Sequence, residues 1–310
     1  RSRRRLLGIS QETLADGICE PRTLSRIENY GGNLHKKNRK ELLRRVNMSG
    51  ERYDYEVITD QYEDYILRSE LDRAIAIEQI DNAKKLFSKL RHSVPEIKTN
   101  CQHLIKTECK IRNALPEGHP EKLMLCEWTS LLEDAIHYTL PIELHEIEEW
   151  PAGILSINET LLLLSYALCK KRARNYEESL RVLSYVRECL ENTGADRSFY
   201  EDLYTRVGVD IASVLSDLGR YEESDTLACS CVNLAIENQN TRRIAKCLYG
   251  MAWNSTRPSA DTSGGEQLRK EKTAELLKQA YTAAVISGDY ARQKRIRDFF
   301  VKTIGIDLEL

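Results

Sequence analysis

Two short stretches near the start of the sequence carry side chains suited to contact with a polyanion. Guanidinium and hydroxyl groups lie close together in residues 21–30, and four cations fall within residues 36–40. Cationic side chains bind phosphate oxygens, whereas arginine, glutamine, serine and threonine can also hydrogen-bond the edges of bases. The candidate nucleic-acid contacts are Gln11, Arg22, Thr23, Ser25, Arg26, Lys36, Lys37, Arg39 and Lys40.

The net charge of the chain hides an asymmetry between its two ends. The 310 residues sum to a charge of −2, yet residues 1–50 carry +7 and the remainder carries −9. A basic head on an acidic body suits a protein of which only one end meets DNA. A charged face that is merely solvated would produce the same imbalance, so charge alone does not decide between these two interpretations.

The residues around the first basic stretch predict two short helices joined by a turn. Ser10 is a good N-cap for a helix over residues 11–17, and Gly17 begins a turn. Pro21 suits the first position of a second helix, which we expect to end at about Tyr30. This spacing is typical of a helix-turn-helix.

The second helix has a buried face and a polar, basic face. Leu24 and Ile27 form the buried face, so Arg22, Arg26 and the hydroxyl side chains between them point outward. In a helix-turn-helix the second helix lies in the major groove and the first crosses the backbone, which places Gln11 against phosphate. The cations of residues 36–40 open a third helix and suit phosphate contacts.

The pattern over about residues 6–48 resembles the helix-turn-helix class of Cro and the phage repressors. Two positions depart from that class. Glu20 stands where a small capping residue is usual, and Tyr30 precedes Gly31 where the class goes directly from asparagine to glycine. The end of the recognition helix is therefore left open, and a helical pair used only for packing is the alternative. The matching residues are Ser10, Gln11, Glu12, Leu14, Ala15, Gly17, Ile18, Cys19, Leu24, Ser25, Arg26, Ile27, Glu28 and Asn29.

The rest of the chain shows amphipathic helical runs separated by proline and glycine, with an internal repeat. Residues 175–179 recur as residues 220–224, which places Tyr176 and Tyr221 45 residues apart. Weaker copies begin at Ile80 and at Gly288. The pattern is similar to that of tetratricopeptide repeats, whose helix pairs stack into a solenoid with a concave groove.

The repeat register indicates which polar residues face that groove. Ala167, Ala212 and Gly250 occupy the tight helix-crossing positions, and the polar residues near them on the first helices point inward. Ordinary surface polar residues would fit the same pattern. The candidate peptide-binding residues are Asn158, Lys171, Arg206, Ser213, Ser216 and Asn254.

A repressor-type helix-turn-helix followed by such repeats resembles the peptide-pheromone-responsive regulators of Gram-positive bacteria, the Rgg, PlcR, NprR and PrgX group. The resemblance spans nearly the whole chain and rests on architecture and on residues 10–29. It implies a homodimer, a palindromic operator in double-stranded DNA, and a short imported signalling peptide bound in the groove, as in quorum sensing. None of these three partners follows from spacing or composition.

The fold class that we expect is all-α, in two domains. Residues 1–50 form the helix-turn-helix DNA-binding domain, whose first helix we expect to be truncated because no methionine opens the sequence. Residues 51–310 form a tetratricopeptide-like α-solenoid for ligand binding and dimerisation. Low glycine and proline content and abundant charge favour this class.

Motifs for catalysis, metal binding and membrane insertion are missing. The six histidines are scattered and the nine cysteines form no CxxC pair, so we expect no cofactor, no metal and no enzymatic activity. Cys109, Cys169, Cys189 and Cys247 fit helical apolar patterns as free, buried thiols in a reducing cytoplasm. The longest apolar run, residues 160–169, is too short to cross a bilayer.

Two functions of different classes remain open. The first is a sequence-specific transcription regulator controlled by a short peptide in the repeat groove. The alternative is a protein-binding adaptor built on helical repeats, with a regulator or antitoxin-like role that is independent of a peptide pheromone. Salt-dependent DNA binding would separate them, because only the first neutralises phosphates.

Overall fold

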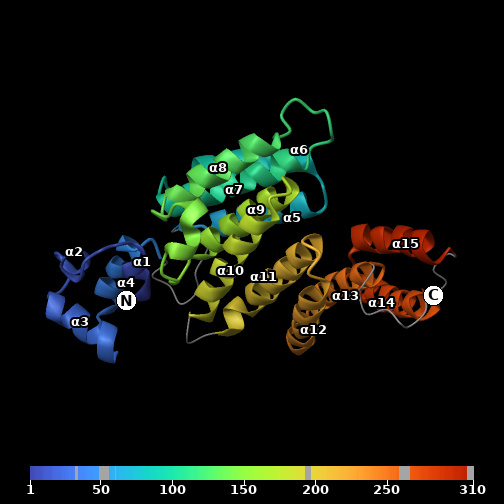
Figure 1. Cartoon of the computed structure of the whole chain (residues 1–310). Helices are drawn as coiled ribbons and strands as arrows, with labels where there is room; N and C mark the ends of the chain where they lie inside the picture. The colour runs from blue at the N-terminus through green and yellow to red at the C-terminus, as the bar shows by residue number, and fades with distance from the viewer. Residues whose placement is uncertain (32–33, 49–55, 60, 193–196, 258–265, 306–310) are drawn as a thin grey trace. The chain divides into compact units, whose positions relative to one another are not determined.

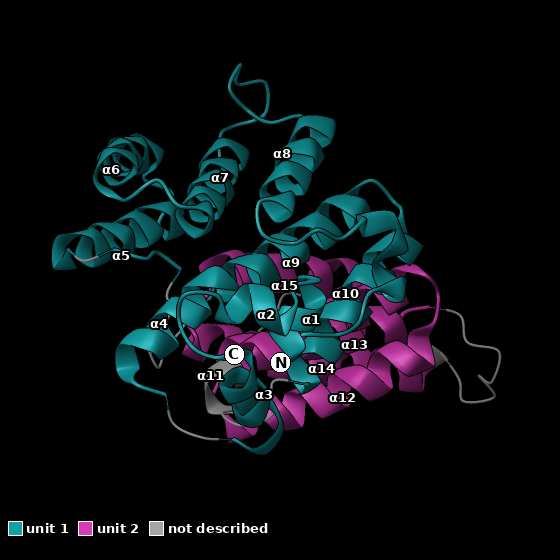
Figure 2. Ribbon diagram, turned by 90° about the vertical axis from the view of Figure 1, so that its left-hand side faces the viewer, with its two compact units in different colours: residues 1–193 teal, residues 194–310 magenta. Residues whose placement is uncertain are grey.

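The computed structural model describes residues 1–31, 34–48, 56–59, 61–192, 197–257 and 266–305. Every regular element in this described part is a helix (Figure 1). The chain forms two compact units, residues 1–193 and residues 194–310 (Figure 2). The predicted domain boundary near residue 50 falls in residues 49–55, outside the described residues, and stays a prediction.

Unit 1 begins with four short helices packed around a small core. Leu14 and Ala15 of the second helix, Leu24 of the third, and Leu42 and Val46 from the fourth are buried together. The predicted second helix of the motif is confirmed from its first residue to its last. The four helices are α1 (Ser2–Leu6), α2 (Gln11–Ala15), α3 (Pro21–Tyr30) and α4 (Lys36–Arg45).

The rest of unit 1 consists of longer helices that pack as consecutive neighbours. Leu71 and Ala74 of α5 are buried against Ala83 and Leu90 of α6, as the predicted weak repeat at Ile80 requires. The apolar run 160–169 lies within α9, where most of its side chains are buried. The elements are α5 (Tyr62–Ala76), α6 (Ile80–Ser93), α7 (Lys98–Asn113), α8 (Leu125–His137), the 3-10 helix η1 (Leu144–Glu149), α9 (Ile157–Arg172) and α10 (Tyr176–Glu191).

The described residues of unit 2 form five helices, and two groups of their side chains are buried together. Val209 and Ala212 of α11 pack with Ala228 of α12 and Cys247 of α13. A second cluster joins α13, α14 and α15, where alanines allow the helices to approach closely. The helices are α11 (Arg197–Asp217), α12 (Tyr221–Glu237), α13 (Thr241–Ser255), α14 (Glu266–Ile286) and α15 (Tyr290–Ile304).

The predicted repeat is confirmed by a pair of equivalent hydrogen bonds. In the hairpin of α9 and α10, the Ser179 hydroxyl donates to the carbonyl oxygen of Ala167 at 2.8 Å. In the hairpin of α11 and α12, the Ser224 hydroxyl donates to the carbonyl oxygen of Ala212 at 2.7 Å. A small buried serine facing the predicted crossing alanine therefore recurs after 45 residues, like the two tyrosines.

The turns of these hairpins also share a backbone conformation. The residue two positions before the second helix has a positive φ in each turn, +61° at Arg174 and +77° at Gly219. Glycine adopts this region readily, whereas arginine is strained in it. The turn geometry is thus set by the packing of the helices rather than by one residue type.

The four thiols predicted to be buried, at Cys109, Cys169, Cys189 and Cys247, are buried and free. Burial raises the pKa of the Cys109 and Cys169 thiols to about 12, which keeps them protonated. They therefore pack as small apolar groups. No helix in the described part of the chain is long and apolar enough to cross a membrane.

Candidate nucleic-acid interface and ligand pocket

The turn between α2 and α3 is built by local sequence signals. The Ser10 hydroxyl accepts a hydrogen bond from the backbone N–H of Thr13 at 3.1 Å and so caps α2, as predicted. Gly17 supplies a φ of +66° in the turn, and Pro21 stands at the start of α3. Glu20 occupies the N-cap position without a side-chain hydrogen bond. The departure from the repressor pattern at this position therefore leaves the N-terminus of α3 without a side-chain cap.

The side chains predicted to read bases lie along the start of α3. Arg22 and Arg26 are exposed, one helical turn apart, and neither has an ion-pair partner among the described residues. Thr23 and Ser25 are half-buried between them. Residues four apart lie on the same side of a helix, so the two guanidinium groups share one face.

The Gln11 side chain is engaged in a hydrogen bond within the protein in this structure. Its side-chain amide donates to the Glu28 carboxylate at 2.7 Å, and Arg4 donates to both oxygens of the same carboxylate at 2.8 and 2.9 Å. The Arg4 guanidinium and the Gln11 amide lower the pKa of Glu28 to about 2. Gln11 thus fastens α2 to α3, and its contact with phosphate stays a prediction.

The four cations at the start of α4 are exposed and lack ion-pair partners among the described residues. The first turn of α4 holds no acidic residue, although the N-terminus of a helix carries partial positive charge. Placing several cations there is unfavourable by roughly 0.3–1 kcal/mol each at the surface. An anionic partner would remove this repulsion. The residues are Lys36, Lys37, Arg39 and Lys40.

A buried ion pair that sequence reasoning missed joins the first helix to the repeats within unit 1. Arg3 is 4% exposed and Glu159, at the start of α9, is 0% exposed. Two parallel hydrogen bonds of 2.7 and 2.6 Å link the guanidinium to the carboxylate. Arg3 also donates to the carbonyl oxygens of Val46 and Ile154 at 2.9 and 3.1 Å. Arg3 therefore connects the first four helices to α9.

The carboxylate of Glu159 also accepts hydrogen bonds from residues other than Arg3. It accepts from the backbone N–H of Ser156 at 2.7 Å, and the Ser156 hydroxyl accepts from the N–H of Glu159, which forms a capping box. The Thr139 hydroxyl donates to it at 2.5 Å. The Ser-x-x-Glu spacing could have identified the cap, but nothing local indicates that Arg3 is the ionic partner.

Asn158 is a packing residue rather than a groove residue. It is 1% exposed, and its amide donates to the carbonyl oxygens of Glu56 and Thr99 at 2.7 and 3.1 Å. The Nζ of Lys106 donates to its side-chain oxygen at 3.1 Å. These three hydrogen bonds all lie inside unit 1 and the side chain is buried, so we leave Asn158 out of the proposed peptide site.

The other predicted groove residues are divided between the two units. Lys171 is half-buried on α9 in unit 1, and Arg206 is half-buried on α11 in unit 2, where Asp210 lies 3.9 Å from it. Asn254 is 4% exposed and binds Ser216, Ser224 and Asp225. Asn254 therefore supports the wall of a cavity rather than lining it.

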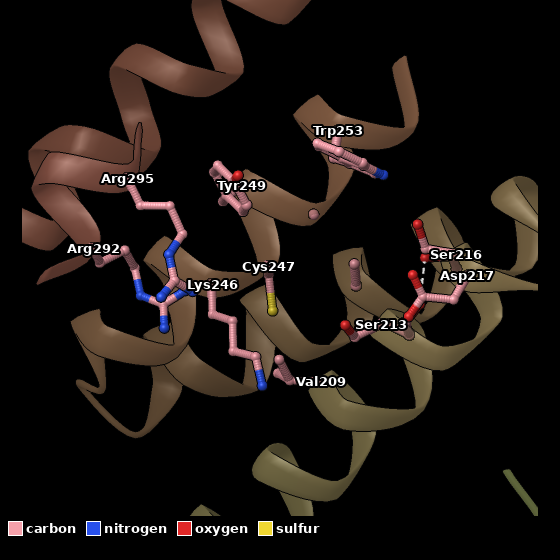
Figure 3. Close-up of a pocket in the computed structure, with 14 residues that line it drawn as sticks. Val209, Ser213, Ser216, Asp217, Lys246, Cys247, Tyr249, Trp253, Arg292 and Arg295 are labelled. Carbon is pink, nitrogen blue, oxygen red and sulfur yellow. Dashed lines mark hydrogen bonds between the residues drawn. The ribbon is translucent and has the colours of Figure 1, made fainter. Parts of the chain in front are cut away.

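Unit 2 contains a pocket of about 330 Å³, which we call the unit 2 pocket. Ser213 and Ser216 of α11, both predicted peptide contacts, line it. Their peptide-binding role stays a prediction, because lining a pocket does not identify the ligand that the pocket binds. Sequence reasoning missed the other polar and aromatic lining residues, which include Lys246, Tyr249 and Trp253 of α13 and Arg292 and Arg295 of α15 (Figure 3).

Comparison with known proteins identifies the fold. No protein-family model matches the sequence, and no curated protein matches it. The structure is similar to that of PlcR from Bacillus thuringiensis in complex with the peptide PapR7 and DNA, with a TM-score of 0.59 and 13% identity over 95% of each chain. The Streptococcus dysgalactiae SHP pheromone receptor Rgg2 matches over 97% of this chain and 96% of its own, with 14% identity and a TM-score of 0.45. The likeness to PlcR confirms the all-α fold class and the predicted resemblance at the level of fold.

Proposed function

We propose that this protein is a DNA-binding transcription regulator whose activity is controlled by a short signalling peptide bound to its helical repeats. The observation that carries the proposal is the set of exposed cations at the starts of α3 and α4, which have no ion-pair partner in the part of the chain that the structure describes. Two further points support it. PlcR, which has a similar fold, was solved with a peptide and DNA, and unit 2 holds a pocket large enough for part of a peptide.

The arginines of α3 and the cations at the start of α4 have different roles in this proposal. Arg22 and Arg26, on one face of α3, hydrogen-bond base edges and so read sequence. The lysines at the start of α4 contact phosphates and fix the position of the protein on the duplex. A homodimer on a palindromic operator completes the proposal, because a two-fold dimer presents two recognition helices to two half-sites.

The test is DNA binding by the whole chain. Binding is measured on the duplex upstream of its own gene and on a scrambled duplex, at two salt concentrations, with and without a peptide extract of the culture. We expect salt-sensitive binding that prefers the upstream duplex and changes with the extract. Arg26→Ala should reduce that preference by about 1–3 kcal/mol if the guanidinium grips a guanine.

Absence of DNA binding in every condition would contradict the proposal and favour the protein-binding adaptor. Binding that prefers the upstream duplex but does not change with the extract would support the proposed DNA binding and contradict the proposed control by a peptide. A ligand can change DNA affinity only through a difference in its affinity for two states of the protein, for which coupling of about 1–3 kcal/mol is typical.

A further inference from the structure

The unit 2 pocket has a cationic side and an aromatic side. The guanidinium groups of Arg292 and Arg295 lie close together, the Lys246 side chain extends towards Val209, and Trp253 lies away from the two arginines (Figure 3). Buried apolar residues of α11, α12 and α13, among them Val209 and Cys247, line it as well. The lining therefore suits a ligand that combines an anionic group with an apolar group.

The cations of the pocket are only partly matched by acidic residues. Lys246 forms an ion pair with Asp210, and Arg292 lies 3.3 Å from Asp289. Arg295 is exposed and has no ion-pair partner among the described residues. A guanidinium that borders a cavity and has no carboxylate of its own can bind a ligand carboxylate through two parallel hydrogen bonds.

Helix α15 supports the aromatic side of the pocket. The rings of Tyr249 and Trp253 pack on Phe299 of α15, with centroid distances of 5.6 and 5.2 Å. Burial raises the pKa of the Tyr249 hydroxyl, for which the described residues provide no hydrogen-bond partner. Packing on α15 thus supports both rings, and the Tyr249 hydroxyl adds a hydrogen-bond donor to this side of the pocket.

The size of the pocket limits how much of a ligand it holds. Its volume of about 330 Å³ is at the lower end of the range for small-ligand sites, which is roughly 300–1,000 Å³. One bulky residue and its carboxylate fill such a space, whereas a whole signalling peptide does not. The pocket is therefore suited to anchor one part of a longer chain.

We infer that the unit 2 pocket anchors a peptide through a carboxylate bound by Arg295 and an adjacent apolar side chain packed on Tyr249 and Trp253. This inference rests on the proposed function, since it names the chemistry of the peptide that the regulator senses. The carboxylate can be the C-terminus of the peptide or an acidic side chain beside a large apolar residue. Lys246 and Arg292 add positive potential around it.

The test uses three acetylated dipeptides as probes, titrated into the whole chain by calorimetry. Acetyl-Gln-Phe with a free C-terminus carries only the terminal carboxylate, and acetyl-Glu-Phe amide carries only the side-chain carboxylate. Acetyl-Gln-Phe amide carries neither. We expect at least one carboxylate probe to bind about tenfold more tightly than the uncharged probe, because charge-assisted hydrogen bonds are the stronger ones. The tighter probe identifies the source of the carboxylate.

Two variants and one control locate the binding. Arg295→Gln should abolish the advantage of the carboxylate probe, whereas Lys294→Gln makes the same charge change at an exposed neighbour outside the pocket lining and should not. Gly250 lines the pocket, and a Cβ added there meets no atom within 4 Å. Gly250→Leu should therefore fill the pocket and abolish binding while α13 stays folded, as helical circular dichroism will check.

Equal binding of the three probes, or no binding of any, would overturn the inference, as would an equal loss in Arg295→Gln and Lys294→Gln. DNA is absent from these titrations, so the two proposals fail separately. A chain that binds the carboxylate probe but no DNA contradicts the proposed function only. A chain that binds DNA but treats the three probes alike contradicts the carboxylate anchor only.

Discussion

Two arginines in this molecule, Arg3 and Arg295, show how differently the same side chain is used. Arg3 is buried, and Glu159 and two carbonyl oxygens accept its hydrogen bonds. Arg295 borders a pocket, exposed and without an ion-pair partner in the described part of the chain. A buried charge with a counter-charge stabilises the fold, whereas an exposed charge without an ion-pair partner can bind a ligand, as we propose for Arg295 and for the cations of α3 and α4.

The largest expected effect comes from breaking the matched pair. Glu159→Gln leaves the Arg3 guanidinium buried without a counter-charge, and we expect a loss of about 3–5 kcal/mol in the free energy of unfolding. Urea denaturation followed by circular dichroism measures it. Arg295→Gln is the matched comparison and should change stability by less than about 0.5 kcal/mol, since its side chain is exposed. Similar losses of unfolding free energy in both variants would contradict the distinction between the buried Arg3 pair and the exposed Arg295.

A second, smaller effect concerns the Glu28 carboxylate, near the end of α3. Hydrogen bonds from Arg4 and Gln11 hold its pKa at about 2, below the ordinary value of 4.5, and its side chain is 5% exposed. Because the folded pKa is the lower one, this stabilisation is present above about pH 4.5 and is lost as the pH falls towards 2. Glu28→Gln should lower stability by about 2 kcal/mol at neutral pH.

The measurement for Glu28 is the midpoint of urea unfolding at several pH values between neutral and acid. The variant should lose part of the acid sensitivity that the parent chain shows. Glu41→Gln removes a carboxylate from a solvent-exposed pair with Arg44 and serves as the control, with a much smaller change. An unchanged pH profile in Glu28→Gln would show that the Arg4 pair does not stabilise the fold.

Gly153 and Gly250 differ in how closely other atoms pack around them. A Cβ on Gly153 would lie 3.0 Å from the Cβ of Leu6, which is buried in α1, whereas a Cβ on Gly250 meets nothing. Gly153→Ala should therefore destabilise the chain by about 1–3 kcal/mol through overpacking. Gly250→Ala, within a helix, should stabilise it by about 1 kcal/mol. Thermal unfolding distinguishes these opposite signs, and shifts of the same sign would contradict the packing described for α1.

Much of the fold could be predicted because its signals are local. Pro21 before an amphipathic run fixed the start of α3, and the echo of Tyr176 in Tyr221 placed two equivalent helix starts. The small crossing residues Ala167 and Ala212 also followed from that echo, and their hydrogen bonds to equivalent serines confirm the register. Each of these features depends on residues within one hairpin.

The remainder depends on residues far apart in the chain. Arg3 and Glu159 are separated by 156 positions, so the sequence showed Arg3 only as part of a basic end and gave no sign of its partner. Asn158 fitted the groove register, but packing against α7 and Glu56 buries it. The pocket cations come from α13 and α15, and their convergence is set by helix packing that no local pattern encodes.

The most direct test of the account replaces unmatched cations at the start of α4 and measures DNA affinity as a function of salt. Lys36→Gln, Lys37→Gln and Lys40→Gln together should weaken binding to every duplex and lower the slope of log affinity against log salt by about 3, without loss of stability. The control removes the same charge at exposed Lys85, Lys89 and Lys294 and should leave the slope unchanged. Equal slopes for the two triple variants would contradict the proposal that the cations at the start of α4 contact DNA.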